Sequence, residues 1–264
     1  MKKLNTTKAI TRIIGGMLAC TTMVMANQIS AFAYTLETGT YVYSDTVSKE
    51  HYLDRYYNDS AVRERAEYIW NFLKNHGFND VSASAVIGNF MCETGNLDCS
   101  VYEGGVDDYA DGIGLAQWTT INGGLGTGVH ADLAQFAYEN YGCYNYTPYP
   151  WESTYNTWVS NLDCQLSFFV SDSAHGNKDM TWYGYSSLAE LPWNVEYLSD
   201  FASHDWLADA GWDTARAIKR ATEVFCFRWE VASGDYSNIG DVRLPSALAT
   251  YEYFTGYSAG EIWY

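Results

Sequence analysis

One acidic residue interrupts a largely apolar stretch of the chain, VSASAVIGNFMCETG at residues 81–95. This residue, Glu93, stands where the apolar run ends and where a helix over that run would also end. The negative end of the helix dipole and the apolar neighbours Phe90 and Met91 both favour the protonated form of its carboxyl group. A carboxyl group that keeps its proton near neutral pH is suited to general acid catalysis. The alternative is a solvated glutamate that merely ends the helix.

Cleavage of a glycosidic bond is one reaction that uses such an acid. It also needs a second carboxylate, or a positioned water, on the opposite side of the bond. Several acids follow Glu93 in the sequence, namely Asp98, Glu103, Asp107, Asp108 and Asp111. Asp111 adjoins the turn expected at Gly112 and Gly114, so we rank it first as the second catalytic carboxylate. Asp108 ranks second and is also a candidate substrate-binding residue, although a solvated acidic loop explains each of these acids equally well.

Other kinds of site fit the sequence less well. The segment GIGLAQW, residues 112–118, has Gln117 where a dinucleotide-binding fingerprint has its third glycine, and an acidic loop rather than a strand precedes it. The cysteines lack the spacing of zinc ligands. Neither His-Glu-x-x-His nor Gly-x-Ser-x-Gly, which mark other classes of hydrolase, occurs in the chain. We therefore expect no metal site and no cofactor.

The elements that would position these groups are mainly helices. Ser60 is the expected N-cap of the helix over 61–77, and Gly77 is its expected stop. In the helix over 82–93, Gly88 would let a neighbour approach closely, and Gly95 would end the helix in a left-handed conformation. Apolar residues recur at helical spacing over 61–77, 82–93, 130–141, 157–171, 213–230 and 244–254.

The remaining segments carry no helical period. Residues 96–128 are rich in Gly and Asp and are expected to form loops with a short hairpin. Residues 172–212 are a Trp- and Tyr-rich connection with weak helical hints. The expected fold class is therefore mainly α (α+β), one helical domain with a small irregular β-hairpin insert between its second and third helices.

The N-terminal residues have the composition of a secretory signal peptide. They combine four basic residues, no acid, an apolar run and the cleavage pattern Ala31-Phe32-Ala33. The apolar run is shorter than the roughly 20 residues that span a bilayer, so an uncleaved anchor is the weaker alternative, and a lipoprotein signal ending at Cys20 is another. The expected organisation is a signal peptide at 1–33, a leading arm at 34–59 and a catalytic domain at 60–264.

Cleavage would leave an exported and strongly acidic protein. The full chain has a formal net charge of −17 at pH 7, and loss of the four basic residues of the leader brings it to −21. Nucleic acids and anionic membrane surfaces both require a basic face. We therefore expect a secreted monomer, outside the cell or in the cell wall, with neither as a partner. Aromatic residues make up 17% of the chain, and their rings suit stacking on sugars or an aromatic core equally well.

The cysteines indicate disulfide bonds if the protein is exported. Five would remain after cleavage, which is compatible with two disulfides and one thiol, and the connectivity stays open. We favour Cys92 with Cys99, a pair that would brace the loop after Glu93. Such a bridge closes a loop of about 8 residues and would contribute ~2.5 kcal/mol if it formed without strain. The other three cysteines are Cys143, Cys164 and Cys226.

Four segments together carry a resemblance to a known family: IWNFLKNHGF, GNFMCETGNLD, GIGLAQWTT and VFCFRWE. In this combination the chain, from about residue 66 to 254, resembles the phage tail lysozyme family, within the lysozyme-like superfamily of lysozymes and lytic transglycosylases. That family pairs a helix ending in Glu-Ser-Gly with a downstream Gly-x-Gly-Leu-x-Gln-Trp segment. Here Thr94 stands in the place of the serine.

The resemblance implies a lysozyme-like helical fold that cleaves the β-1,4 glycan strands of peptidoglycan. It implies that Glu93 is the catalytic acid and that Gln117 and Trp118 line the glycan cleft. It does not identify the second carboxylate, so Asp111 remains an inference from spacing. Hydrolysis and transglycosylation both remain open, as do retention and inversion. A non-catalytic, exported glycan-binding domain on the same scaffold is a further alternative.

A second glutamate, Glu230, lies near the end of the helix expected at 213–230. It either lines the cleft or pairs at the helix end with Arg228 or Arg243. We favour the pairing.

Overall fold

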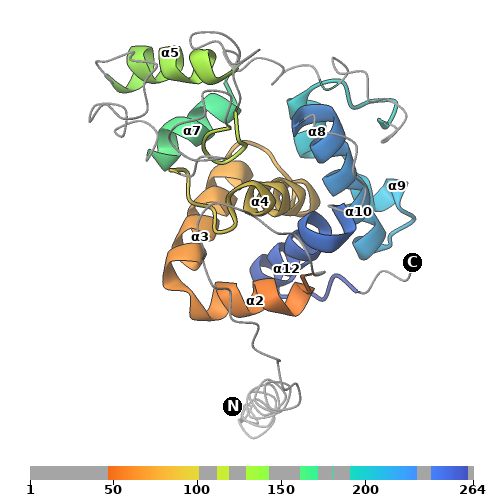
Figure 1. Cartoon of the computed structure of the whole chain (residues 1–264). Helices are drawn as coiled ribbons and strands as arrows, with labels where there is room; N and C mark the ends of the chain where they lie inside the picture. The colour runs from red at the N-terminus through yellow and green to blue at the C-terminus, as the bar shows by residue number, and fades with distance from the viewer. Residues whose placement is uncertain are drawn as a thin grey trace, which may run out of the picture. The chain divides into compact units, whose positions relative to one another are not determined.

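The computed structural model of the chain describes residues 47–100, 112–118, 129–142, 161–171, 180, 191–230 and 239–260. All of them fall in one unit, Tyr41–Tyr264. The elements of this part, in chain order, are α2 (Lys49–Asn58), α3 (Ser60–Asn75), α4 (Asp80–Thr94), α5 (Val129–Tyr141), α7 (Leu162–Phe169), α8 (Leu198–Ser203), α9 (Trp206–Asp209), α10 (Thr214–Val224), the π-helices η2 (Phe225–Glu230) and η3 (Ile239–Arg243), and α12 (Leu244–Thr255) (Figure 1).

The expected mainly helical fold is confirmed, since the described residues form helices and no named strand. The expected hairpin is not seen among them. Residues 112–118 form a turn in which an isolated antiparallel bridge joins Ile113 to Trp118. Every helix predicted from apolar spacing has a counterpart, in α3, α4, α5, α7, α10 with η2, and α12. The connection at 172–212 contributes the short helices α8 and α9.

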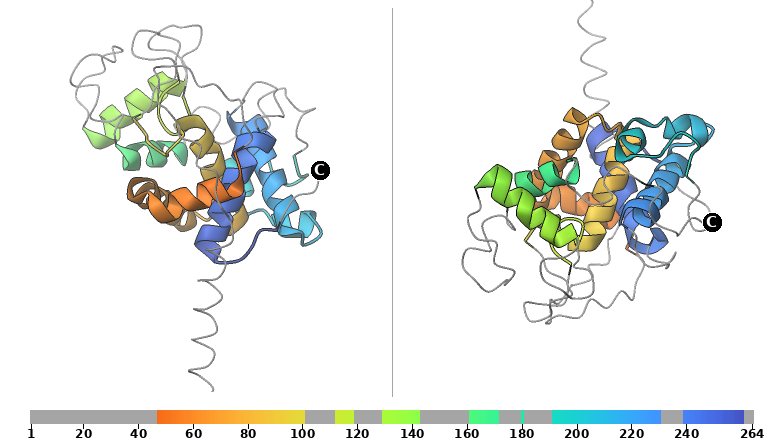
Figure 2. Two further views of the ribbon diagram at one scale, coloured as in Figure 1. Left: turned by 60° about the horizontal axis from the view of Figure 1, so that its bottom comes forward. Right: turned by 90° about the horizontal axis from the view of Figure 1, so that it is seen from above.

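Helix α4 lies at the centre of the described part. It packs against α3, α8, α10, α12 and both π-helices. Figure 1 shows it between α3 on one side and α10 and α12 on the other, and the views in Figure 2 keep this arrangement. Residues 81–92 of this helix are all buried. A helix that is covered on all sides is apolar all round rather than amphipathic, which explains why so little charge interrupts this stretch.

Gly88 lets α4 and α12 approach closely, as its position in the sequence predicted. A Cβ atom at this residue would lie 2.6 Å from the Cβ of Ala247 and 2.8 Å from the carbonyl oxygen of Arg243. Any side chain would therefore push the two helices apart. The close approach brings Arg243, the last residue of η3, next to α4.

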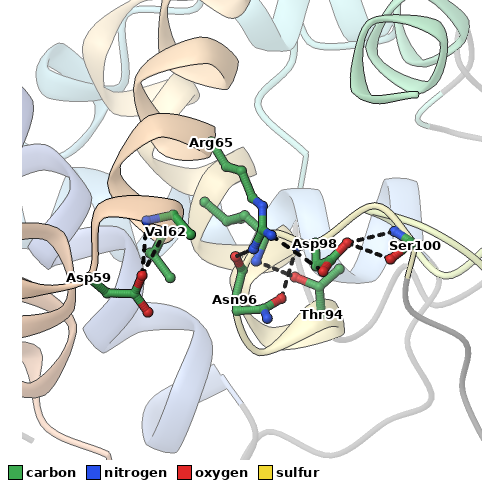
Figure 3. A network of polar contacts seen from close by, with 9 residues as sticks. Asp59, Val62, Arg65, Thr94, Asn96, Asp98 and Ser100 are labelled. Atoms are coloured by element: carbon green, nitrogen blue, oxygen red, sulfur yellow. Dashed lines mark hydrogen bonds and ion pairs between the residues drawn. The ribbon is translucent and has the colours of Figure 1, made fainter. Parts of the chain in front are cut away.

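The ends of α3 and α4 are set by an aspartate and a glycine. Asp59, not the expected Ser60, is the N-cap of α3. Its carboxylate accepts hydrogen bonds from the backbone N–H groups of Ala61 and Val62 at 3.0 and 3.2 Å (Figure 3). Ser60 is the first helical residue instead, because the aspartate before it already satisfies both of these donors. Gly95 ends α4 with a φ of 68°, which confirms its predicted left-handed conformation.

Part of the expected leading arm belongs to the helical unit. Within 34–59, residues 49–58 form α2, which packs against α12. The buried side chains of α2 are Tyr52 and Tyr56, and the Tyr56 hydroxyl hydrogen-bonds the hydroxyl of Thr250 at 2.7 Å. This helix has no apolar period in the sequence, because two tyrosines four residues apart form its buried face and stand in an otherwise polar segment.

No helix in the part of the chain that the structure describes is both long and apolar enough to span a bilayer. The predicted signal peptide at 1–33 lies outside the described residues, and so do Asp108, Asp111 and Cys143.

Candidate active site

Glu93 is the next-to-last residue of α4 and stands at the boundary between the core and the solvent. Its side chain is 22% exposed, whereas residues 81–92 before it are buried. The left-handed turn at Gly95 ends the helix two residues later. The sequence therefore places this acid at the end of a buried helix, where its carboxyl group is partly open to solvent.

The guanidinium group of Arg243 binds this carboxylate and two further side chains. Its Nη2 atom donates to Glu93 Oε1. Its Nη1 atom donates to Glu230 Oε2 at 2.5 Å and to Asn89 Oδ1 at 2.8 Å. Asn89 is held in turn, because its amide donates to the carbonyl oxygen of Ala85 at 2.8 Å. One buried arginine thus joins α4, η2 and η3 through charge-assisted hydrogen bonds.

Glu230 is the buried member of this cluster. Its side chain is only 3% exposed, as is that of Arg243. Burial raises the pKa of Glu230 to about 8, although the positive charge of Arg243 acts in the opposite direction. Its second oxygen, Oε1, has no hydrogen-bond partner among the described residues. The expectation that Glu230 pairs at the helix end with Arg228 or Arg243 is confirmed for Arg243.

Arg243 changes the electrostatic argument for Glu93. The end of the helix dipole and the apolar neighbours are the local surroundings that the sequence predicts for this carboxyl group. A guanidinium group in hydrogen-bonding contact adds a fixed positive charge beside it. The site therefore contains a group that can stabilise negative charge on Glu93.

Two arginines from neighbouring helices hold the loop that follows Glu93. Arg55 of α2 donates to the carbonyl oxygen of Gly95. Arg65 of α3 donates to the carbonyl oxygen of Asn96 at 3.2 Å and lies 3.4 Å from the carboxylate of Asp98 (Figure 3). These contacts satisfy carbonyl groups just beyond the helix end, which have no partner within the helix. The loop is therefore tied to α2 and α3.

Thr94 supports the same loop from within. Its hydroxyl group donates to the carbonyl oxygen of Phe90 at 2.8 Å and accepts a hydrogen bond from the N–H group of Leu97 at 2.8 Å. A serine hydroxyl can make both bonds as well, so threonine is a conservative replacement in the Glu-Ser-Gly pattern.

The predicted disulfide between Cys92 and Cys99 is wrong. The described residues contain no disulfide, and both side chains are buried. They lie in different surroundings, since Cys92 is close to Arg243 whereas Cys99 is close to Asp98. Cys92 belongs to the helix and Cys99 to the loop beyond it, and closeness in sequence does not bring their sulfur atoms together.

A buried glutamine connects this loop to the turn at 112–118. Gln165 of α7 donates through Nε2 to the carbonyl oxygen of Cys99 at 2.8 Å, and its Oε1 accepts from the N–H group of Leu115 at 3.0 Å. Gly114 makes room for it, because a Cβ atom there would lie 2.4 Å from Gln165 Oε1. Apolar spacing does not single out Gln165, although an amide among the apolar residues of the predicted helix is a signal for a buried polar contact.

Gln117 and Trp118 lie on this turn and are largely buried, at 9% and 5% exposure. Gln117 has a φ of 47°, and its amide donates to the carbonyl oxygen of Gly114 at 2.9 Å. The Trp118 ring packs edge-on against Phe168, with ring centroids 5.5 Å apart. Through Gln165 the structure brings the turn that carries these two residues to the loop that follows Glu93.

Within the described ranges no group of three His, Cys, Asp or Glu side chains is placed to hold a metal ion. The chemistry that the cluster itself can perform is proton transfer at Glu93, next to a fixed positive charge.

Comparison with known proteins assigns the chain to a family. The sequence model of a family described as phage tail lysozyme matches residues 64–254, which is more than half of the chain. No curated protein and no solved structure matches. The matched span includes Glu93, the turn at 112–118, Glu230 and Arg243.

Replacing Gln165 by leucine is expected to destabilise the protein by about 2 kcal/mol, because a buried N–H group and a buried carbonyl group each lose their partner. The matched control is Gln135→Leu, at an exposed position of α5. Urea unfolding of both variants measures the difference. Equal stability of Gln165→Leu and the parent would show that the hydrogen bonds of Gln165 to the loop after Glu93 and to the turn at 112–118 contribute nothing to the free energy of unfolding.

Glu230 is expected to make stability depend on pH. Because its pKa is raised from 4.5 to about 8 on folding, the folded protein keeps a proton that the unfolded chain has lost between these values. The free energy of unfolding should therefore fall as the pH rises from about 5 to about 8. The fall should be smaller in Glu230→Gln, whose amide does not titrate. Urea unfolding at several pH values across this range tests this, and equal slopes in both proteins would contradict it.

Proposed function

The chain belongs to the phage tail lysozyme family, and from this premise we propose that it cleaves the glycan strands of peptidoglycan with Glu93 as the general acid. The family is lysozyme-like, which supports peptidoglycan as the substrate. The observation that carries the assignment of Glu93 is its place at the solvent-accessible end of a buried helix, in contact with Arg243.

The proposed reaction begins with a proton transfer. Glu93 donates its proton to the oxygen of the β-1,4 glycosidic bond, the bond between that oxygen and the anomeric carbon breaks, and the leaving sugar departs as an alcohol. Glu93 becomes a carboxylate in this step. Arg243 stabilises the negative charge that develops there, through a hydrogen bond that already exists in the free protein.

The second half of the reaction has two forms. In a lysozyme, water attacks the anomeric carbon, and Asp111 is our candidate for the carboxylate that assists on the opposite face. In a lytic transglycosylase, a hydroxyl group of the same sugar attacks instead and leaves an anhydro end. We favour the glycoside hydrolase and keep the transglycosylase as the alternative.

Substrate contacts are proposed for three residues. Gln117 and Trp118 are supported by their turn, which Gln165 joins to the loop after Glu93. Asp108 is proposed from its sequence position beside Asp111. No cofactor takes part in this scheme.

The proposed setting is outside the cell or in the cell wall. A signal peptide at 1–33 would direct export, and the mature protein would carry a charge of −21. Its proposed catalytic domain spans 60–264, to which α2 adds residues 49–58. We propose that it acts as a monomer, without nucleic acid or membrane as a partner.

The test is release of soluble fragments from purified peptidoglycan. The parent should release fragments, and Glu93→Gln should release them at least about 100-fold more slowly, because the amide cannot donate the proton. Glu64→Gln, at an exposed position of α3, is the matched control and should behave as the parent. Thermal unfolding of each variant checks that it is folded.

The outcomes separate the alternatives. Mass analysis of the fragments distinguishes reducing ends, made by hydrolysis, from the anhydro ends of a transglycosylase. Undiminished release by Glu93→Gln would exclude Glu93 as the acid. A folded parent that binds peptidoglycan and releases nothing would instead identify a non-catalytic glycan-binding domain.

A further inference from the structure

Glu230 is a second carboxyl group on the guanidinium that binds Glu93, and the proposed reaction leaves it without a role. The two glutamates share Arg243, which donates to Glu93 through Nη2 and to Glu230 through Nη1. They differ in exposure, since the side chain of Glu93 is 22% exposed and that of Glu230 is 3% exposed. One of them can therefore reach a substrate and the other is enclosed.

Among the described residues around Glu230, few carry a charge besides Arg243 and Glu93. Arg243 faces it from η3, Glu93 and Cys92 face the same guanidinium from α4, and Cys226 lies on η2 itself. Burial raises the pKa of Cys92 to about 12, and it also raises the pKa of Cys226, so both thiols stay neutral. Among the described residues, the remaining charges of this cluster are one guanidinium and two carboxyl groups.

This set of charges is neutral when it holds one proton. A buried cluster strongly disfavours net charge, so one guanidinium with two carboxyl groups favours a single proton on one of the two. The proton on Glu93 leaves Glu230 ionised, and the proton on Glu230 leaves Glu93 ionised. Carboxyl groups that interact in this way titrate as a coupled pair.

A purely structural role explains Glu230 poorly. Its Oε1 atom has no hydrogen-bond partner among the described residues, and burial of an unpaired polar atom costs free energy. Arg243 is already hydrogen-bonded by Asn89 and Glu93. Buried ion pairs are also weak contributors to stability when compared with apolar side chains of the same size.

We propose that Glu230 is a positioning residue that acts through Arg243 to set how readily Glu93 holds and releases its proton. The proposal rests on the function of Glu93 as the general acid. When Glu230 is ionised, it neutralises part of the guanidinium charge and repels negative charge on Glu93, so Glu93 holds its proton at higher pH. When Glu230 is neutral, Glu93 faces the full positive charge and loses its proton at lower pH. The single proton of the cluster is therefore shared between the two glutamates, and the reaction proceeds from the form in which Glu93 carries it.

The test is the pH profile of kcat/KM on peptidoglycan for the parent and for Glu230→Gln. The amide oxygen can still accept from Arg243, but the residue can no longer become negative. The alkaline limb of the profile, where the acid loses its proton, should move to lower pH by about one unit. Glu223→Gln is the matched control, because this glutamate on α10 pairs with Lys219 instead, and its limb should stay in place.

A uniform loss of activity in Glu230→Gln with an unmoved limb would show that Glu230 only supports the fold, and would overturn the proposal. Carbon-13 NMR of the glutamate carboxyl groups gives a readout that needs no activity. The Glu93 signal, identified by its loss in Glu93→Gln, should titrate in two steps in the parent and in one step, at lower pH, in Glu230→Gln.

The NMR titration tests the coupling even if a variant does not fold or if the proposed function is wrong. If Glu230→Gln does not fold, the titration of the Glu93 signal in the parent still tests the proposal. A single titration step there would refute the coupling between the two glutamates. If Glu93→Gln retains full activity, Glu93 is not the acid, and the titration then shows independently whether the two glutamates are coupled.

Discussion

The buried guanidinium group of Arg243 is the interaction on which the site depends. It hydrogen-bonds Asn89 and Glu93 of α4 and Glu230 at the end of η2. A charge removed from water in this way is tolerated only when opposite charges and hydrogen bonds surround it. The three elements are therefore constrained together, because displacement of any one of them would leave a buried charge without its partner. The same constraint holds the carboxylate of Glu93 in one place.

Close packing and irregular helix geometry make that interaction possible. Gly88 brings α12 and the end of η3 against α4. Glu230 and Arg243 are the last residues of the two π-helices. A π-helical turn contains more residues than an α-helical turn, so side chains at its end point in a different direction from those of a regular helix, and such turns are frequent at functional sites. Here the ends of the two π-helices carry a carboxyl group and a guanidinium group that are hydrogen-bonded to each other.

Much of the fold could be predicted from the sequence, because local patterns encode it. The apolar spacing predicts α3, α4, α5, α7, α10 and α12, and the sequence positions of Gly88 and Gly95 predict the roles that the structure confirms. Prediction failed where the signal was not apolar or not local. The buried face of α2 is made of tyrosines, and the contacts that brace the loop after Glu93 come from Arg55 and Arg65 on other helices. The predicted cysteine bridge had only closeness in sequence to support it.

The sequence by itself determined the helical class, the family and the place of Glu93 at the end of a buried helix, since each depends on residues that are neighbours along the chain or on motifs read from it. Only the tertiary structure decided what surrounds that acid. Arg243 lies 150 residues from Glu93, and Gln165 lies 66 residues from Cys99. Interactions over such separations depend on how helices pack, and no local pattern of residues records them.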